Sequence, residues 1–396
     1  MIKAIREKYN ADFTQERYAA FLNEFESMFN KKVEFRIAET PVFVDKKLKQ
    51  KLLEAGEQIL KCVLTDDYLK QSDKAIPKNL FAPNEPKRPQ VLAVDFAVCK
   101  NEIDEFTPQL IELQAFPSLF FWQDILAKQY KKYFSVPDGF SQLMNGLTDE
   151  TYWSLIRKTF LGNHHPDNVI LLEIEPDKQK TWIDFYGTRL MTGIEPVCIS
   201  KIIVKGKKLF YVKDGKETEI NRIYNRVIFD ELLQRNDLQR QFNLTEDVDV
   251  EWVGHPNWFF RISKYAMPFI KSEYAPPSYF LSELKEYPAD LENYVLKPLF
   301  SFAGSGVVID VTTKILEGIT DRENYILQKK VEYAPAFESP TGSVKVEIRL
   351  LYVLDENDVM PKPVITMGRL SKGAMIGVNH NKNKDWVGGS SALLEE

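Results

Sequence analysis

The chain has 396 residues, of which 44% are hydrophobic and 28% are charged, and this ordinary globular composition excludes wholesale disorder. Its 52 Lys and Arg against 57 Asp and Glu give a formal net charge of −5, so no overall positive field exists for binding nucleic acid or an anionic membrane. Three widely separated cysteines, Cys62, Cys99 and Cys198, argue against a disulfide framework or a zinc cluster. The N-terminus lacks a signal-peptide pattern and no apolar stretch approaches about 18 residues, so we expect a soluble cytoplasmic protein.

Helices dominate the elements predicted for residues 1–165. Apolar residues at helical spacing predict one helix from about Thr14 to Phe29 and a second helix that follows the N-cap residue Asp45 and reaches Val63. The further elements expected here are a connecting loop at 72–89, strands at Val91–Val98 and Gln109–Ala115, a helix over Leu119–Phe134 capped by Ser118, and a helix over Asp149–Leu161.

Strand patterns dominate from residue 168 onward. An Asp214-Gly215 pair marks a hairpin turn. The strands expected are Val169–Glu173, Val197–Val204, Leu209–Val212, Thr218–Asn225, Tyr294–Lys297, Val307–Asp310, Tyr325–Val331 and Val344–Leu354. We divide the chain into N-terminal helices with core strands (1–165), a small α/β unit with a β-meander (166–254), a lid lobe (255–343) and a return to the core sheet (344–396).

Oxygen-bearing side chains occur in the first two predicted strands. Asp95 interrupts an apolar run, where a buried carboxylate is costly without a cation or several donors. In the next strand, the two-residue period places Glu112 and Gln114 on one face. If the two strands pair, these three side chains converge, and such hard oxygen donors suit Mg²⁺ with phosphate oxygens. The alternative is a pair of half-exposed strands with ordinary polar faces.

A second feature is a strand that ends in Lys297 and leads into the small-residue segment 301–306. Gly304 and Gly306 let backbone N–H groups approach an anion closely, and Lys297 adds a positive charge. The segment is no P-loop, because no Gly-Lys-Ser/Thr opens a helix, and it lacks the third glycine of the dinucleotide fingerprint. The alternative is a tight hairpin turn.

Three further polar positions lie in the last third of the chain. The strand containing Gln328 has a backbone that suits the edge of an adenine. Alternation in the strand that follows places Glu347 and Arg349 on one face. Arg369 lies among small residues. Each of these alone is more often the polar face of a sheet than a site.

Taken in chain order, these motifs resemble those of ATP-grasp ligases. Val94-Asp95-Phe96 followed by Ile111-Glu112-Leu113-Gln114 and Pro117 resembles the metal segment Asp-Phe … Glu-x-Asn-x-x-Pro. The Lys297 strand with the glycine-rich segment resembles the family's lysine strand and lid, Tyr325–Gln328 resembles the nucleotide hinge, and Lys264 resembles the upstream ATP lysine. Because the metal segment precedes the lid, the order is similar to that of the circularly permuted branch that includes the synthetase domain of glutathionylspermidine synthase.

The resemblance implies an α+β fold of ATP-grasp type in circularly permuted order, with an added small α/β domain on the substrate side. It implies ATP and Mg²⁺ as cofactors. The ATP-binding residues it implies are Lys264, Lys297, Ala303, Gly304, Ser305, Gly306, Gln328 and Val331. Asp95, Glu112 and Gln114 would hold the metal, with Glu347 as an alternative to Gln114, and Arg369 would be the catalytic residue that stabilises the transferring phosphoryl group.

The implied activity is the ATP-dependent joining of a small-molecule or peptide carboxylate to an amine through an acyl phosphate. Two departures from the family's pattern favour an alternative, an ATP- and Mg²⁺-binding protein without turnover that serves as a scaffold or sensor. Gln114 stands where the family has a metal-binding Asn, and Val94 stands where it has an Arg. A third class, a peptide- or carbohydrate-binding module, would need neither ATP nor Mg²⁺.

Overall fold

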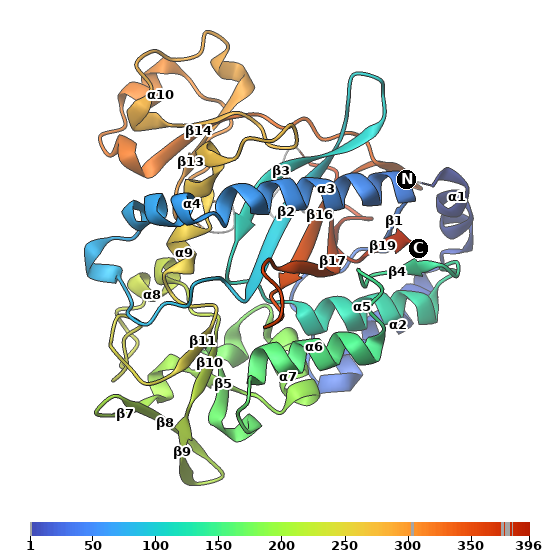
Figure 1. Ribbon diagram of the computed structural model, residues 1–396. Helices are drawn as coiled ribbons and strands as arrows, with labels where there is room; N and C mark the ends of the chain where they lie inside the picture. Colours follow the sequence, from blue (N-terminus) through green and yellow to red (C-terminus); the bar gives the residue numbers. More distant parts are fainter. Residues whose placement is uncertain (1, 302–304, 374–375, 377–380, 382) are drawn as a thin grey trace.

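The computed structural model describes residues 2–301, 305–373, 376, 381 and 383–396. Its central feature is an antiparallel sheet, the core sheet, with the strand order β18-β17-β16-β2-β3 and with β15 paired to β16 off this path. The bounds of these strands are β2 Val91–Lys100, β3 Phe106–Gln114, β15 Phe337–Ser339, β16 Gly342–Val353, β17 Lys362–Ser371 and β18 Gly388–Ser390. The chain therefore builds β2 and β3 early and completes the same sheet more than two hundred residues later (Figure 1).

Smaller sheets surround the core sheet. A parallel sheet has the order β11-β10-β5-β6, and an antiparallel lid sheet has the order β12-β14-β13. The meander β7-β8-β9 and the group β1-β19-β4 complete the described sheets. Their bounds are β1 Val42–Val44, β4 Phe140–Ser141, β5 Val169–Glu173, β6 Glu195–Cys198, β7 Ile203–Lys205, β8 Lys208–Lys213, β9 Lys216–Ile220, β10 Arg222–Asn225, β11 Glu251–Val253, β12 Ser278–Phe280, β13 Tyr294–Pro298, β14 Tyr325–Lys329 and β19 Ala392–Glu395.

Helices cover these sheets and connect them. The α-helices are α1 Lys3–Asp12, α2 Gln15–Phe29, α3 Lys46–Val63, α4 Asp66–Gln71, α5 Phe120–Tyr133, α6 Asp149–Leu161, α7 Trp182–Thr192, α8 Phe229–Gln234, α9 Trp258–Arg261 and α10 Thr313–Glu317. The 3₁₀ helices are η1 Ser72–Ala75, η2 Lys78–Leu80, η3 Pro166–Asn168, η4 Pro176–Lys178, η5 Ile199–Lys201, η6 Lys264–Phe269, η7 Leu281–Glu283, η8 Leu291–Asn293 and η9 Arg322–Asn324.

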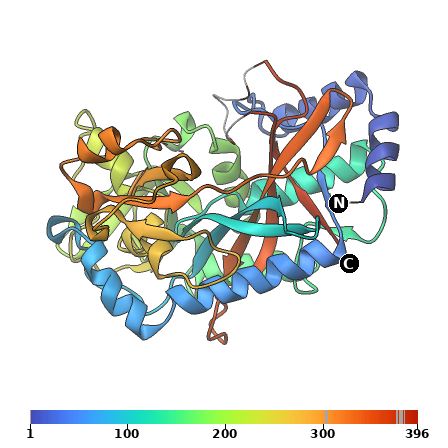
Figure 2. The same cartoon turned by 90° about the horizontal axis from the view of Figure 1, so that it is seen from above.

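The two faces of the core sheet have different partners. One face carries the even-numbered residues of β2 from Leu92 to Val98 and of β16 from Val344 to Tyr352, which are apolar or aromatic and pack under α3 (Figures 1 and 2). The side of α3 that faces them is apolar at helical spacing, from Leu48 to Val63. On the opposite face, Ala93 and Leu351 belong to a second core cluster with residues of α5, α6 and the parallel sheet. Farther along that same face the side chains become polar, beginning at Asp95.

Several expected elements are confirmed, with the expected chemistry at their ends. Helix α2 has the N-cap Thr14, which accepts a hydrogen bond from the Arg17 N–H, and Asp45 caps α3 through the N–H of Leu48. Helix α6 and strand β5 have the predicted bounds. The prediction that Ser118 caps the next helix is wrong.

A carboxylate from another helix replaces the expected cap of α5. Leu119 precedes this helix at a positive φ of 78°, and the Asp184 carboxylate of α7 accepts hydrogen bonds from the N–H groups of Leu119, Phe121 and Trp122 at 2.7, 3.0 and 2.9 Å. Asp184 is fully buried, and its negative charge lies at the positive end of the helix. A partner 62 to 65 residues away has no local signal in the sequence.

Three predicted strands differ in the structure. The stretch 218–225 is divided between β9 of the meander and β10 of the parallel sheet. The stretch 197–204 is divided between β6 and β7 with a 3₁₀ turn between them, and the stretch 307–310 forms only an isolated bridge between Val308 and Leu296. Helix α7 was not predicted. In the described part of the chain, no helix is both long enough and apolar enough to cross a membrane.

The close packing of α7 against α5 requires a glycine at position 187. A Cβ atom at Gly187 of α7 would lie 1.9 Å from the Phe121 ring of α5, which is buried. We expect Gly187→Ala to destabilise the protein by about 1–3 kcal/mol by overpacking, although alanine favours a helix more than glycine does. Guanidinium unfolding monitored by circular dichroism measures this change. Phe121→Leu in the same chain should restore part of the loss, and equal or greater stability of Gly187→Ala alone would contradict the packing argument.

Candidate functional site

A cluster of charged side chains lies on the polar part of the core sheet. Strand register places Asp95 of β2 opposite Glu112 of β3 on one side and opposite Arg349 of β16 on the other. Glu347 lies opposite Arg369 of β17. The pairing of β2 with β3, on which the predicted convergence of Asp95, Glu112 and Gln114 depends, is therefore present. A bulge at Ile111 shifts the register beyond Asp95 and leaves the Ile111 carbonyl outside the regular ladder.

Asp95 is bound by two arginines. Its side chain is only 2% exposed, and its two carboxylate oxygens accept hydrogen bonds from Arg349 Nε at 2.5 Å and Nη2 at 2.7 Å. Arg369 Nη2 also donates to Asp95 Oδ2. Burial by itself would raise the pKa of Asp95, but the two guanidinium groups hold that pKa below its usual value.

The Arg349 guanidinium lies among all three predicted metal ligands. Besides Asp95, it approaches Glu112 Oε1 to 3.8 Å through Nη2. With the Gln114 amide turned so that its oxygen faces Arg349, that oxygen accepts hydrogen bonds from Nη1 and Nη2 at 3.0 and 3.2 Å. Within the residues that the structure describes, no group of three or more His, Cys, Asp and Glu side chains is arranged to hold a metal ion. In this arrangement the three residues do not fit a bound Mg²⁺.

Glu347 forms the other half of the cluster. Its carboxylate lies 2.8 Å from Arg369 Nη2 and accepts a hydrogen bond of 2.9 Å from the Tyr333 hydroxyl. Burial raises the pKa of Glu347, and the carboxylates of Asp95 and Glu112 add to that rise against the opposing effect of Arg369. The carboxylates and arginines therefore form one network in which Arg369 joins Asp95 to Glu347.

Two lysines reach this network from the lid side. Lys297 of β13 donates a hydrogen bond to the bulged Ile111 carbonyl at 3.4 Å, and Lys264 of η6 donates to the Ser301 carbonyl at 2.6 Å. Burial lowers the pKa of Lys297 to about 8, against the raising effect of Glu112 and Glu347 and with a further lowering effect of Lys264. Burial also lowers the pKa of Lys264, which Glu112 and Asp230 oppose.

The predicted glycine-rich lid is described only in part. Ala303 and Gly304 lie outside the described residues, whereas Ser305 and Gly306 form a turn. Gly306 has a φ of 71°, and a Cβ atom there would lie 2.8 Å from Pro298 Cγ. Glycine is therefore required at 306 by both backbone conformation and space.

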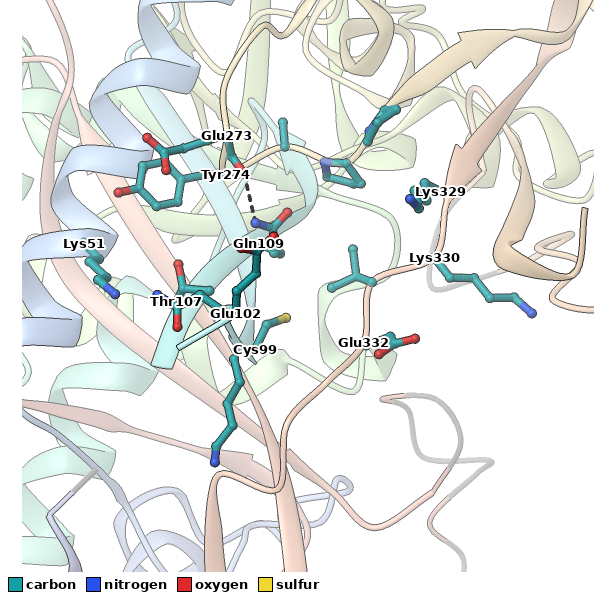
Figure 3. A pocket seen from close by; sticks show the side chains of 16 residues that line it. Lys51, Cys99, Glu102, Thr107, Gln109, Glu273, Tyr274, Lys329, Lys330 and Glu332 are labelled. Carbon is teal, nitrogen blue, oxygen red and sulfur yellow. Dashed lines mark hydrogen bonds between the residues drawn. The ribbon is translucent and has the colours of Figure 1, made fainter. Parts of the chain in front are cut away.

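A cavity of about 510 Å³ is lined by residues 329–332, which directly follow the predicted hinge Tyr325–Gln328 in the chain (Figure 3). Val331 lines this cavity, and the N–H of Val331 has no hydrogen-bond partner among the described residues. The opposite wall comes from Cys99, Thr107 and Gln109, which lie on the same face of the core sheet as Asp95 (Figure 3). Gln328, which is 1% exposed, is fixed by a 3.1 Å hydrogen bond from its Nε2 to the Ser278 hydroxyl.

Arg226 is a candidate binding residue that the sequence analysis did not identify. It directly follows β10, at the edge where the carboxyl ends of the parallel strands meet, and such edges commonly bind ligands. Its Nε and Nη1 atoms are buried and have no hydrogen-bond partner among the described residues. The Arg226 guanidinium lies 6.0 Å from the ring centre of Phe116, two residues beyond Gln114.

A buried carboxyl group accompanies this arginine. Glu173, at the end of β5, is 4% exposed, and burial raises its pKa to about 8 against the lowering effect of Arg226. An arginine at the carboxyl end of a predicted parallel strand is the only signal in the sequence that could have indicated this position. That signal requires recognising the strands as parallel, which the meander between β6 and β10 obscures.

Comparison with known proteins informs the fold. No protein family and no curated protein matches the chain in sequence. Among solved structures, the chain is similar to a glutathione synthetase-like effector from Globodera pallida in its apo form, with a TM-score of 0.58 and 10% sequence identity over 98% of each chain. At this identity the likeness concerns the fold alone. The chain has a mixed α+β fold related to that of this glutathione synthetase-like effector.

Proposed function

We propose that the protein is an ATP-dependent carboxylate–amine ligase that forms an amide through an acyl phosphate. The observation that supports this most is the placement of two kinds of anion-binding group at the end of β3. Lys264 and Lys297 lie on the lid side. On the side of the parallel sheet lies Arg226, whose Nε and Nη1 have no hydrogen-bond partner among the described residues. Such a site can bind phosphate groups and a carboxylate next to each other.

The nucleotide would lie between the core sheet and the lid sheet. Lys264 and Lys297 would bind its phosphates, with the backbone of Ser305 and Gly306 closing over them. The base would enter the cavity lined by residues 329–332, where the Val331 N–H, which has no hydrogen-bond partner among the described residues, offers a polar contact. Gln328 does not line the cavity, because its side chain is 1% exposed and bonds to Ser278. The cavity volume of about 510 Å³ is within the range of small-ligand pockets.

The acid substrate would bind through Arg226. Its carboxylate oxygen would attack the γ-phosphorus of ATP, ADP would leave, and the amine nitrogen would then attack the acyl carbon with phosphate as the leaving group. Arg369 would stabilise the charge on the transferring phosphoryl group, and exclusion of water by the lid would protect the acyl phosphate.

The order of the core strands and the lid along the chain resembles that of the circularly permuted branch. The circularly permuted order and the kinship with the synthetase domain of glutathionylspermidine synthase are supported by β2 and β3 preceding the lid in the chain and pairing with each other. Mg²⁺ stays a prediction for the complex with nucleotide. Glu112, whose side chain is 33% exposed, is the most accessible carboxylate for an ion that enters with the phosphates.

A second candidate is a nucleotide-binding protein on the same scaffold without ligase turnover. The position of Arg349 favours it, because this side chain bonds to the groups that would otherwise hold a catalytic metal. Release of ADP that depends on both an acid and an amine distinguishes the ligase, whereas ATP binding without such release favours the second candidate.

Nucleotide binding should depend on pH through Lys297. Because the pKa of Lys297 is about 8 in the free protein, its ammonium group is charged below this pH and neutral above it. We expect the Kd for ATP, measured by calorimetry, to rise by about tenfold as the pH increases through 8, since one charge-assisted contact is lost.

Lys297→Arg is the matched control for this titration, because arginine stays charged over the whole range. The difference in pH dependence between the two proteins removes the contribution of ATP's own ionisation. An identical pH profile for the wild type and Lys297→Arg would contradict a role of Lys297 in binding phosphate.

Arg226→Ala should separate acid binding from nucleotide binding. We expect the KM for the acid to rise by about tenfold or more in an assay of ADP release with mixtures of carboxylic acids and amines, because a charge-assisted contact is removed. The Kd for ATP should be unchanged, and Arg226→Lys should retain part of the acid affinity. Equal loss of ATP binding in Arg226→Ala would place this arginine at the nucleotide instead.

A further inference from the structure

The Arg349 guanidinium contacts several oxygen-bearing side chains of the kind that usually surround a bound cation. Its planar guanidinium group donates to both oxygens of Asp95, donates to the Gln114 amide oxygen when that amide is turned toward it, and comes within 3.8 Å of Glu112. These are the three side chains whose oxygen atoms would otherwise surround a divalent ion. The Arg349 side chain is only 11% exposed, so the guanidinium has little access to water as an alternative partner.

The strand register makes this arrangement part of the sheet and not an incidental contact. Arg349 lies directly opposite Asp95 across the β16–β2 pair, and Asp95 lies directly opposite Glu112 across the β2–β3 pair. All three residues therefore occupy one row across three hydrogen-bonded strands. A divalent ion at this position would have to displace a two-pronged arginine–carboxylate contact and leave the Arg349 charge buried without its partner.

The surrounding charges also oppose a second cation. The network contains three carboxylates, on Asp95, Glu112 and Glu347, and two arginines, and the lid adds two lysines that interact electrostatically with Glu112. Four cationic side chains thus face three carboxylates, so the carboxylates are already neutralised. Mg²⁺ gives up its hydration shell reluctantly and needs an excess of anionic ligands to do so.

We propose that Arg349 is the resident cation of this carboxylate site, so that the free protein binds no divalent metal ion at Asp95, Glu112 and Gln114. Arg349 is then a positioning residue that keeps the Asp95 and Glu112 side chains fixed on the sheet. This inference does not rest on the proposed function, because it concerns the protein without nucleotide.

Titration of the nucleotide-free protein with Mn²⁺, followed by the electron paramagnetic resonance signal of the free ion, tests the inference. The wild type should leave the free-ion signal unchanged at millimolar Mn²⁺. Arg349→Gln keeps hydrogen-bond donors near Asp95 but removes the charge, and it should gain Mn²⁺ affinity by about tenfold or more, the scale on which neighbouring residues change metal affinity. The same titration is made with Arg349→Ala.

Two controls locate the gained site. Arg349→Lys keeps the positive charge and should gain no Mn²⁺ binding, and adding Asp95→Asn to Arg349→Gln should abolish the gain. Thermal unfolding provides a second measurement, since Mn²⁺ should stabilise Arg349→Gln but not the wild type. The inference would be overturned if the nucleotide-free wild type bound Mn²⁺ at these three residues. Such binding would be seen as a loss of the free-ion signal that Asp95→Asn removes, and this result does not depend on whether the Arg349 variants fold. Folded Arg349→Gln or Arg349→Ala without any gain would overturn it too.

Discussion

The Asp95 carboxylate lies in the middle of the core sheet with its side chain 2% exposed, and a carboxylate removed from water costs several kcal/mol unless a cation accompanies it. Arg349 and Arg369 supply that charge from the two strands that follow β2 across the sheet, 254 and 274 residues later in the chain. The requirement to compensate this one charge therefore links the first half of the chain to its end.

The bulge at Ile111 links this network to the lid. Without an extra residue in β3, the two-residue period would carry Gln109 and Glu112 to opposite faces, because their numbers differ in parity. With the bulge, both lie on the Asp95 face, so the charged cluster and the hinge cavity share one surface. The same bulge leaves the Ile111 carbonyl available to Lys297, which explains how a lysine from the lid sheet is held against the core sheet.

Patterns within short stretches of the sequence predicted the features that depend on neighbouring residues. The apolar spacing of α2 and α3 and the Asp45 cap of α3 were predicted correctly, as was the sharing of one sheet face by Glu347 and Arg349, because these features depend on residues close together in the chain. The partners of those side chains could not be predicted in this way. That Arg349 bonds to Asp95 follows from the pairing of β16 with β2, and the capping of α5 by Asp184 depends on a helix that was not expected.

Arg349 and Arg226 have different hydrogen-bond partners in the structure, which the sequence motifs did not indicate. Both arginines are partly buried, but Arg349 donates to both oxygens of Asp95, whereas Nε and Nη1 of Arg226 have no partner among the described residues. A buried donor without a partner carries a desolvation cost that an anionic ligand can remove, so Arg226 is suited to recognition. Arg349 already has that compensation and is suited to holding its neighbours in place. Residues of the same type thus acquire different roles from the strands that face them, and sequence spacing alone does not distinguish those roles.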